Sequence, residues 1–333
     1  VQPVGIFDNT AYDASNGLAF NQIGDRPWVP PLTQSNLGLF SQLKWQPLER
    51  LVFQGGVRHE RVGVDVDDFV TLTGRSIIGG KLDYDATLFN LGAVYDLTDE
   101  INVYADFSQS FSVADGGLIL RDAPAGLSVT NLNPEAQRVN NYEVGVRGEW
   151  DTVQASLAGF YNQSNLGTTF DRASLAVVRA PERVYGLEAT VDVQPIQRWR
   201  LGSTASFVEG ENDVNRDGTY QALNGFRIPP VKLTTYVENE TLPGWQNRLQ
   251  LLYSGNRDRA FNDAIDFRGV ESFLTLDLIS SLKLGDGTLR LGIQNLLNNQ
   301  YFSPASQLLR LRTNDSFTAA LGRTFSLQYS LQF

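Results

Sequence analysis

Apolar and polar residues alternate along most of the chain with a period of two. In Ile101–Phe111, for example, Ile101, Val103 and Ala105 are apolar, whereas the residues between them are mostly polar. A β-strand with one apolar and one polar face produces this period, because successive side chains point to opposite faces. Thirteen segments show the pattern: Asn36–Trp45, Leu51–Val62, Thr87–Asp96, Ile101–Phe111, Asn141–Trp150, Val153–Asn162, Arg183–Val193, Trp199–Val208, Val231–Glu240, Gln246–Ser254, Phe273–Leu284, Thr288–Leu297 and Phe317–Phe333. The sequence therefore predicts an all-β protein.

The connections between these segments alternate in length. Short links such as Gln46–Arg50 and Gly285–Gly287 alternate with long ones such as Gly63–Ala86 and Gln163–Glu182. Outer-membrane barrels have short turns at one end and long loops at the other, and their strands cross the bilayer in about nine to eleven residues. The pattern favours a transmembrane antiparallel β-barrel. A soluble extracellular β-protein is the alternative.

Aromatic residues support the membrane interpretation. Trp45, Tyr95, Trp150 and Trp199 lie at strand ends beside the short links. Aromatic girdles of this kind mark the interfaces between a bilayer and water. A soluble protein could instead use its tryptophans to close a core.

The last predicted strand ends the sequence. In it, Phe325, Leu327, Tyr329, Leu331 and Phe333 alternate with polar residues, and the sequence stops on the aromatic ring. This arrangement resembles the C-terminal signal by which the barrel-assembly machinery recognises outer-membrane proteins. We therefore expect this machinery and outer-membrane lipid to be partners of the protein.

Several segments, in order, resemble the barrel portion of TonB-dependent outer-membrane siderophore receptors. They are GLFSQLKWQPLERLVFQGGVRHE with Gly56, Arg58 and Glu60, LGAVYDLTDEINVYADFSQSF with Tyr95 and Tyr104, LNPEAQRVNNYEVGVRGEW with Tyr142, Glu143 and Gly145, VYGLEATV with Gly186 and Glu188, LGIQNLLNNQYF with Asn295 and Tyr301, and GRTFSLQYSLQF with Gly322 and Arg323. Each segment alone is a weak signal, and their common order makes the resemblance strong. It implies location in the bacterial outer membrane and uptake of a ferric siderophore, energised by TonB.

The sequence departs from this family at its N-terminal side. Members have a plug domain inside a barrel of about 22 strands, and neither a plug nor an initiating methionine is visible here. We expect residues 1–34 to form an extracellular loop-like segment and residues 35–333 to form the C-terminal part of a longer barrel. The alternative is that Gly5–Tyr12 adds a fourteenth strand, so that the chain closes as a stand-alone channel or hydrophobic-solute porter.

The composition excludes several kinds of chemical site and argues against one class of partner. The 333 residues contain no cysteine and a single histidine, His59, so disulfides, cysteine zinc sites and multi-histidine metal centres are excluded. The net charge is 27 − 37 = −10, which argues against nucleic acid as a partner. The resemblance implies transport without covalent chemistry, so we expect neither an enzyme nor a required cofactor.

The long loops contain candidate ligand-binding residues. Ferric chelates are often anionic, and arginine forks and aromatic rings suit such ligands. The candidates are Arg257, Arg259, Phe261, Tyr301, Phe302, Arg310 and Arg312. The alternative is that these arginines pair with nearby acids such as Asp258 and Asp263 on a solvated surface.

A second candidate site is the segment DVNRDG. Its oxygen donors Asp213, Asn215 and Asp217, followed by Gly218, match the opening of a calcium loop. The twelfth position is Asn224 rather than a bidentate glutamate, and a turn rich in Asp and Asn would have the same letters. A structural calcium ion and a simple loop turn both remain open.

Overall fold

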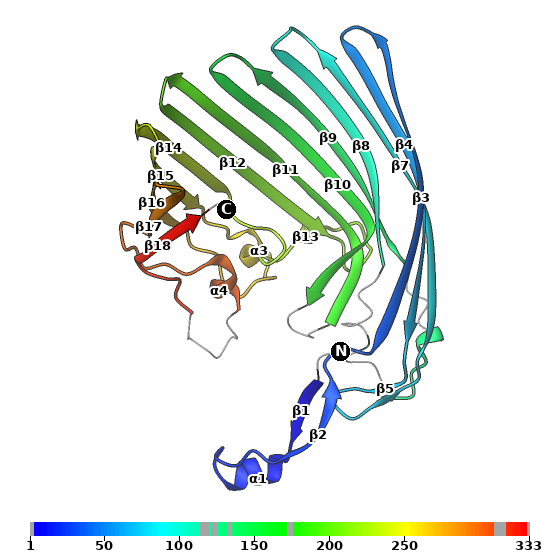
Figure 1. Cartoon of the computed structure of the whole chain (residues 1–333). Helices are drawn as coiled ribbons and strands as arrows, with labels where there is room; N and C mark the ends of the chain where they lie inside the picture. Colours follow the sequence, from blue (N-terminus) through cyan, green and yellow to red (C-terminus); the bar gives the residue numbers. More distant parts are fainter. Residues whose placement is uncertain are drawn as a thin grey trace.

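A computed structural model gives the arrangement of the chain, and it describes residues 3–113, 120, 125–131, 135–171, 176–309 and 318–331. Fourteen strands hydrogen-bond into one sheet, which curves from β3 at one edge to β18 at the other (Figure 1). Thirteen of them follow one antiparallel path, and the short β13 (Gln221–Ala222) pairs with β12 beside that path. The thirteen-strand all-β prediction is confirmed.

The path follows the order of the chain from edge to edge. Its strands are β3 (Leu32–Leu48), β4 (Leu51–Val66), β7 (Gly80–Asp96), β8 (Ile101–Ser112), β9 (Gln137–Glu149), β10 (Val153–Asp171), β11 (Ala176–Ile196), β12 (Trp199–Asn212), β14 (Lys232–Leu242), β15 (Trp245–Ser254), β16 (Phe273–Leu284), β17 (Gly287–Gln294) and β18 (Thr324–Leu331). Every second connection is a turn of two to four residues, as predicted. Glycines with positive φ, at Gly244 and Gly285, allow two of these tight turns.

The segment before β3 does not join the sheet. β1 (Pro3–Phe7) pairs with β2 (Gln22–Pro27), and α1 (Asn9–Ala14) lies between them. Within the described residues β1 does not pair with β3 or β18. The alternative of a sheet closed by Gly5–Tyr12 is therefore wrong, and the domain boundary at residue 34 stays a prediction.

The sheet has an apolar face and a polar face. The strand register shows at which residues the apolar side chains of the first face give way to polar ones. Phe107, Tyr142, Tyr161 and Tyr185 are direct cross-strand partners on β8 to β11, and we call them the aromatic row. Their neighbours one step further from the short turns, on the same face, are Gln109, Asn140, Gln163 and Arg183, which we call the polar row. The stretch from Tyr142 in the aromatic row to Trp150 in the short turn contains nine residues. This length is that of a membrane-crossing strand.

Several strands continue well past the aromatic row, and here the loop boundaries that we predicted are wrong. β10 and β11 contain 19 and 21 residues, so much of Gln163–Glu182 is strand. β4 likewise continues to Val66 and β7 begins at Gly80. The cause is a change of face: apart from Val52, the large apolar residues of β4 lie at odd positions up to Val57 and at even positions from Val62 onward.

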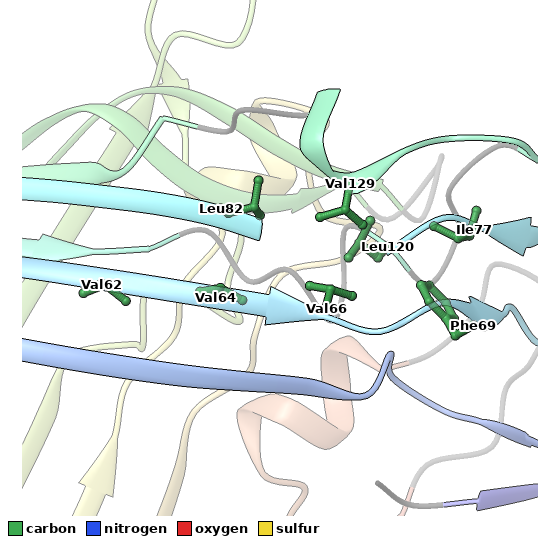
Figure 2. Packing of buried hydrophobic residues seen from close by; sticks show 8 residues of the cluster. All are labelled: Val62, Val64, Val66, Phe69, Ile77, Leu82, Leu120 and Val129. Atoms are coloured by element: carbon green, nitrogen blue, oxygen red, sulfur yellow. The ribbon is translucent and has the colours of Figure 1, made fainter. Parts of the chain in front are cut away.

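These extensions carry the main buried apolar cluster. Val62, Val64 and Val66 of β4 and Leu82 of β7 pack with Phe69 of β5 (Phe69–Val70), Ile77 of β6 (Ser76–Ile77), Leu120 and Val129 (Figure 2). Nearer the short turns, the face on which they lie is polar. Here the long connections fold over that face and bury the apolar side chains. On these extensions the apolar side chains are thus buried under loops.

The strand β18 presents a regular apolar row. Phe325, Leu327, Tyr329 and Leu331 are all largely exposed on one face, and the Tyr329 hydroxyl donates to the Leu284 carbonyl oxygen over 3.0 Å. Phe333 lies outside the described residues. The alternation is confirmed, and recognition by the assembly machinery stays a prediction.

The few helices are short. Besides α1, the helices with described bounds are α3 (Arg259–Asn262), α4 (Pro304–Leu308) and the 3-10 turn Val129–Asn131. Among the described residues no helix has the length and apolar character needed to cross a bilayer.

The substitution Ile77→Ala tests the buried cluster. Ile77 is 2% exposed, so its truncation should lower the free energy of local opening around residues 67–80 by about 3 kcal/mol. Limited proteolysis of the protein in intact cells should then cleave this segment faster. The control is Ile78→Ala, because Ile78 is 56% exposed. Equal cleavage rates of the two variants would contradict a packed cluster.

Candidate functional site

The polar face carries two side-chain networks of similar design. In the first, the Tyr104 hydroxyl on β8 donates to Glu143 Oε1 on β9 over 2.6 Å. The Arg147 guanidinium lies 4.4 Å from the centre of the Tyr104 ring. The ring lies across Gly145, its direct partner in the register, where a Cβ atom would overlap it. The glycine therefore makes room for an aromatic ring that lies flat on the wall and carries a cation.

The second network repeats this arrangement five strands further along the sheet, counted from β8 to β14. The Tyr236 hydroxyl on β14 lies 2.9 Å from both carboxylate oxygens of Asp192 on β11. Its ring lies across Gly202, its partner on β12, and the Arg248 guanidinium is 3.8 Å from the ring centre. Arg200 also pairs with Asp192. Cation–π contacts hold both arginines against the wall.

A cavity of about 550 Å³ lies between the two networks. Arg147 contributes from one side, Tyr236 and Arg248 from the other, and Thr190 and Asp192 lie between them. Arginine forks bind carboxylate and other oxygen anions through paired hydrogen bonds. The cavity can therefore hold an anionic, oxygen-rich group against the polar face.

Two of the predicted loop arginines, Arg257 and Arg259, form ion pairs that hold a loop in place. The Arg257 side chain is only 5% exposed, and its Nη2 donates to the Leu223 carbonyl oxygen over 3.0 Å and to Glu209 Oε2 over 3.2 Å. Arg259 pairs with Glu209 over 3.3 Å and also with Glu211. The acids are thus those of β12 rather than the neighbouring Asp258 and Asp263 that the sequence suggested.

The charge of Arg259 is secured by its surroundings. Its Nη1 donates to the Tyr185 hydroxyl oxygen over 3.2 Å. This bond and the Glu211 carboxylate raise the pKa of Arg259 above its usual value, although burial opposes the shift. Arg257 and Arg259 together fix the segment between β15 and β16 to the outer extensions of β11 and β12. We call these two arginines with Glu209 and Glu211 the arginine clamp.

The other candidates are dispersed. Phe261 is 48% exposed and lies in α3, within the clamped segment. Tyr301 stacks on Phe273, with ring centres 4.4 Å apart, and the Phe302 carbonyl oxygen accepts from Gln307 Nε2 over 3.0 Å. Arg310 and Arg312 lie outside the described residues. Ligand binding by these residues stays a prediction.

The segment around Asp213 forms hydrogen-bonded turns. Asp213 Oδ1 and Oδ2 accept from the backbone N–H groups of Asp217 and Gly218 over 3.1 and 2.8 Å, and Asn224 Oδ1 accepts from two backbone N–H groups. Both Asp213 oxygens therefore already have donors, which fits a turn better than a calcium loop. In the described part of the chain no group of three or more acidic, histidine or cysteine residues could hold a metal. A calcium ion involving Asp213, Asn215 and Asp217 stays a prediction.

Sequence reasoning missed the networks of the polar face. Tyr104, Glu143 and Gly145 enter the sequence argument only as parts of a resemblance, and Arg147, Tyr236 and Arg248 do not enter it. A usable signal exists, because each tyrosine faces a glycine in the register. That signal requires the strand register, which single-strand periodicity does not give.

Comparison with known proteins identifies the sheet. Residues 3–296 match the family described as "TonB dependent receptor-like, beta-barrel". The chain belongs to this family. Barrels of TonB-dependent receptors lie in the outer membrane, so the polar face lines the lumen and the apolar face contacts lipid. The aromatic row and the short turns mark the two sides of the hydrocarbon layer.

Several curated relatives are named as receptors. The "Rhizobactin receptor" of Rhizobium meliloti (strain 1021) is 30% identical over 324 residues, which are 89% of this chain and 42% of the relative. The "Ferric aerobactin receptor" of Klebsiella pneumoniae is 28% identical over 360 residues, 98% of this chain and 48% of the relative. The chain thus spans about half the length of these curated relatives.

Solved structures show the same fold. "Copper transporter OprC" superposes with a TM-score of 0.74 at 17% identity, over 92% of this chain and 49% of the other. The ferric yersiniabactin uptake receptor FyuA from Yersinia pestis gives a TM-score of 0.68 at 20% identity, over 89% and 45%. At these identities the likeness establishes the fold and leaves the ligand open.

The substitution Arg257→Ala tests the arginine clamp. It leaves Glu209 nearly buried with one partner fewer, which should lower the free energy of local opening of residues 255–272 by about 3 kcal/mol. Hydrogen exchange measured by mass spectrometry on the detergent-solubilised protein should then be faster in this segment. The control is Arg50→Ala, since Arg50 and Asp99 form an exposed pair at a short turn that contributes little. Unchanged exchange in residues 255–272 would refute the clamp.

Proposed function

We propose that the protein containing this chain is a receptor that takes up a ferric siderophore through the outer membrane. The observation that carries the proposal is that two curated relatives, matched over most of this chain, are named rhizobactin and ferric aerobactin receptors. We assign the same ligand class, an iron chelate with several oxygen donors, to this protein. The proposal also includes the remaining part of the barrel, a plug domain, and energy supplied by TonB.

The cavity on the lumenal wall supports an anionic ligand. Arg147 and Arg248 face it from opposite sides, and each lies on a tyrosine ring that limits its motion. Arginines that are held in place lose less side-chain entropy when they bind an anion, so they bind it more tightly. The wall is thus suited to contact the carboxylate or hydroxamate oxygens of a chelate on its way through the barrel.

Transport of this kind involves no bond making or breaking in the ligand. The residues of the wall bind and release a preformed chelate, so the proposal includes no catalytic residue and no cofactor other than the iron complex carried. A stand-alone channel has no support, because its closing strand is absent from the described sheet.

Deletion of the gene that encodes this chain tests the proposal. Under iron limitation, the deletion strain should lose uptake of radioactive iron presented as ferric rhizobactin or aerobactin, and the intact gene should restore it. Ferric catecholate and ferric citrate complexes serve as controls for uptake through other receptors. Uptake of every chelate at the wild-type rate in the deletion strain would overturn the proposal.

The substitution Arg248→Gln tests the lumenal cavity. Loss of one charge-assisted hydrogen bond should weaken binding of the ferric chelate about tenfold, as measured by titration of the purified full-length receptor. The control is Arg290→Gln on the same face, because Arg290 is exposed and lies outside the cavity. Equal affinities of the two variants would exclude the cavity from the binding site and leave the proposed function standing.

A further inference from the structure

Three long connections at the outer end of the sheet are linked to one another. They are residues 213–231, 255–272 and 295–323, and we call their described residues the cap. β13 of the first connection lies beside α3 of the second (Figure 1), and the Gly225 N–H group donates to Asp266 Oδ2 over 2.8 Å. Gln307 of the third connection accepts from the Glu271 N–H group over 2.8 Å and donates to the Glu271 carbonyl oxygen over 3.1 Å. We therefore expect the three connections to move together.

The first connection of the cap rests on the lumenal face of the wall. Leu223 and Ile228 are 1% and 2% exposed and lie over Gly210 of β12, where an added Cβ atom would come within 2.8 Å of each side chain. Gly210 follows Glu209, the register partner of Tyr185, so it lies on the face opposite the aromatic row. Because the aromatic row faces outward, this part of the cap covers the lumenal side of β12.

One ion pair joins the cap to the lumenal face of β11. Glu182 is 6% exposed, and its Oε1 accepts from Arg227 Nη2 over 2.6 Å. Its other carboxylate oxygen, Oε2, is buried and has no hydrogen-bond partner among the described residues. The side chain lies across Gly167 of β10, where an added Cβ atom would lie 2.6 Å from Oε2. The docked cap thus buries an acid that has a partner for only one of its two oxygens.

The groups around Glu182 offer a single compensating charge. Ser164 of β10 and Asn212 of β12 are its register partners, and both are uncharged. Arg183, the next residue of β11, points to the opposite face and pairs with Glu211 there. Burial raises the pKa of Glu182 above its usual value, and the charge of Arg227 offsets only part of this rise.

We propose that Glu182 and Arg227 form a proton-dependent latch that docks the cap on the lumenal wall. A buried carboxylate with an unpaired oxygen costs more free energy as an anion than as a neutral acid. Undocking of the cap returns Glu182 to water, where the anion is well solvated. The docked state therefore binds the proton more tightly than the undocked state does.

The sign of the pH dependence follows from this difference. The extra stability of the docked cap is fully present below the pKa that Glu182 has in water. It is lost as the pH rises through the higher pKa of the docked state. Acid thus holds the cap on the lumenal wall, and neutral medium loosens it at the outer end of the barrel.

Hydrogen exchange measured by mass spectrometry on the detergent-solubilised full-length receptor, without ligand, tests the latch. In the wild type, exchange of residues 219–230, corrected for the intrinsic rate, should slow severalfold between about pH 8 and about pH 5. Glu182→Gln removes the titrating group and should abolish this dependence, whatever its absolute rate. Arg227→Gln removes the cation that favours the charged acid, so the midpoint of the transition should move to higher pH.

A matched control is Glu271→Gln, the same chemical change at an exposed acid of the cap. It should keep the pH dependence of the wild type. The latch is refuted if Glu182→Gln responds to pH as the wild type does, or if the wild type shows no response. Should Glu182→Gln fail to assemble, Arg227→Gln decides alone, since a midpoint that stays or moves to lower pH contradicts the proposal. No chelate enters the measurement, so the latch and the proposed transport function can fail separately.

Discussion

One constraint governs the rest of the structure. Every backbone N–H and C=O group inside a bilayer needs a hydrogen-bond partner within the protein. Hydrocarbon offers no hydrogen bonds, so strands can cross it only when neighbouring strands satisfy them. The antiparallel path from β3 to β18 meets this requirement strand by strand. Because a paired strand points its side chains alternately to two sides, one face contacts lipid and the other the lumen. The period of two in the sequence is the direct result.

The side chains of the lumenal wall use the space that this pairing leaves. Cross-strand partners lie close together, so a large ring fits flat on the wall only where its partner is a glycine. Tyr104 with Gly145 and Tyr236 with Gly202 are two such pairs, and each ring supports an arginine. Two glycines therefore determine where cations are held on the wall. The proposed ligand contacts rest on this arrangement.

Beyond the aromatic row the surroundings change, and the same strands follow different rules. Water replaces lipid outside, and long connections cover the inner side. Val62, Val64 and Val66 accordingly face the covering segments instead of lipid. Arg257 and Arg259 bind Glu209 and Glu211 of β12 on the other face of the sheet. An apolar cluster and an ionic clamp thus fix the outer extensions of the barrel.

The local pattern of the sequence is enough to predict the fold class, the thirteen strands of the antiparallel path and the end of the sheet that carries the short turns. It could do so because a lipid-facing strand imposes a local pattern, visible without knowledge of any neighbour. Tertiary structure alone decided where the strands end, since the pattern shifts from odd to even positions at Val57 and Val62 although the strand continues. It also decided the role of Arg257 and Arg259, whose partners Glu209 and Glu211 lie about 50 residues away in the chain. Long-range contacts of this kind depend on register and loop path, which leave no periodic trace in the sequence.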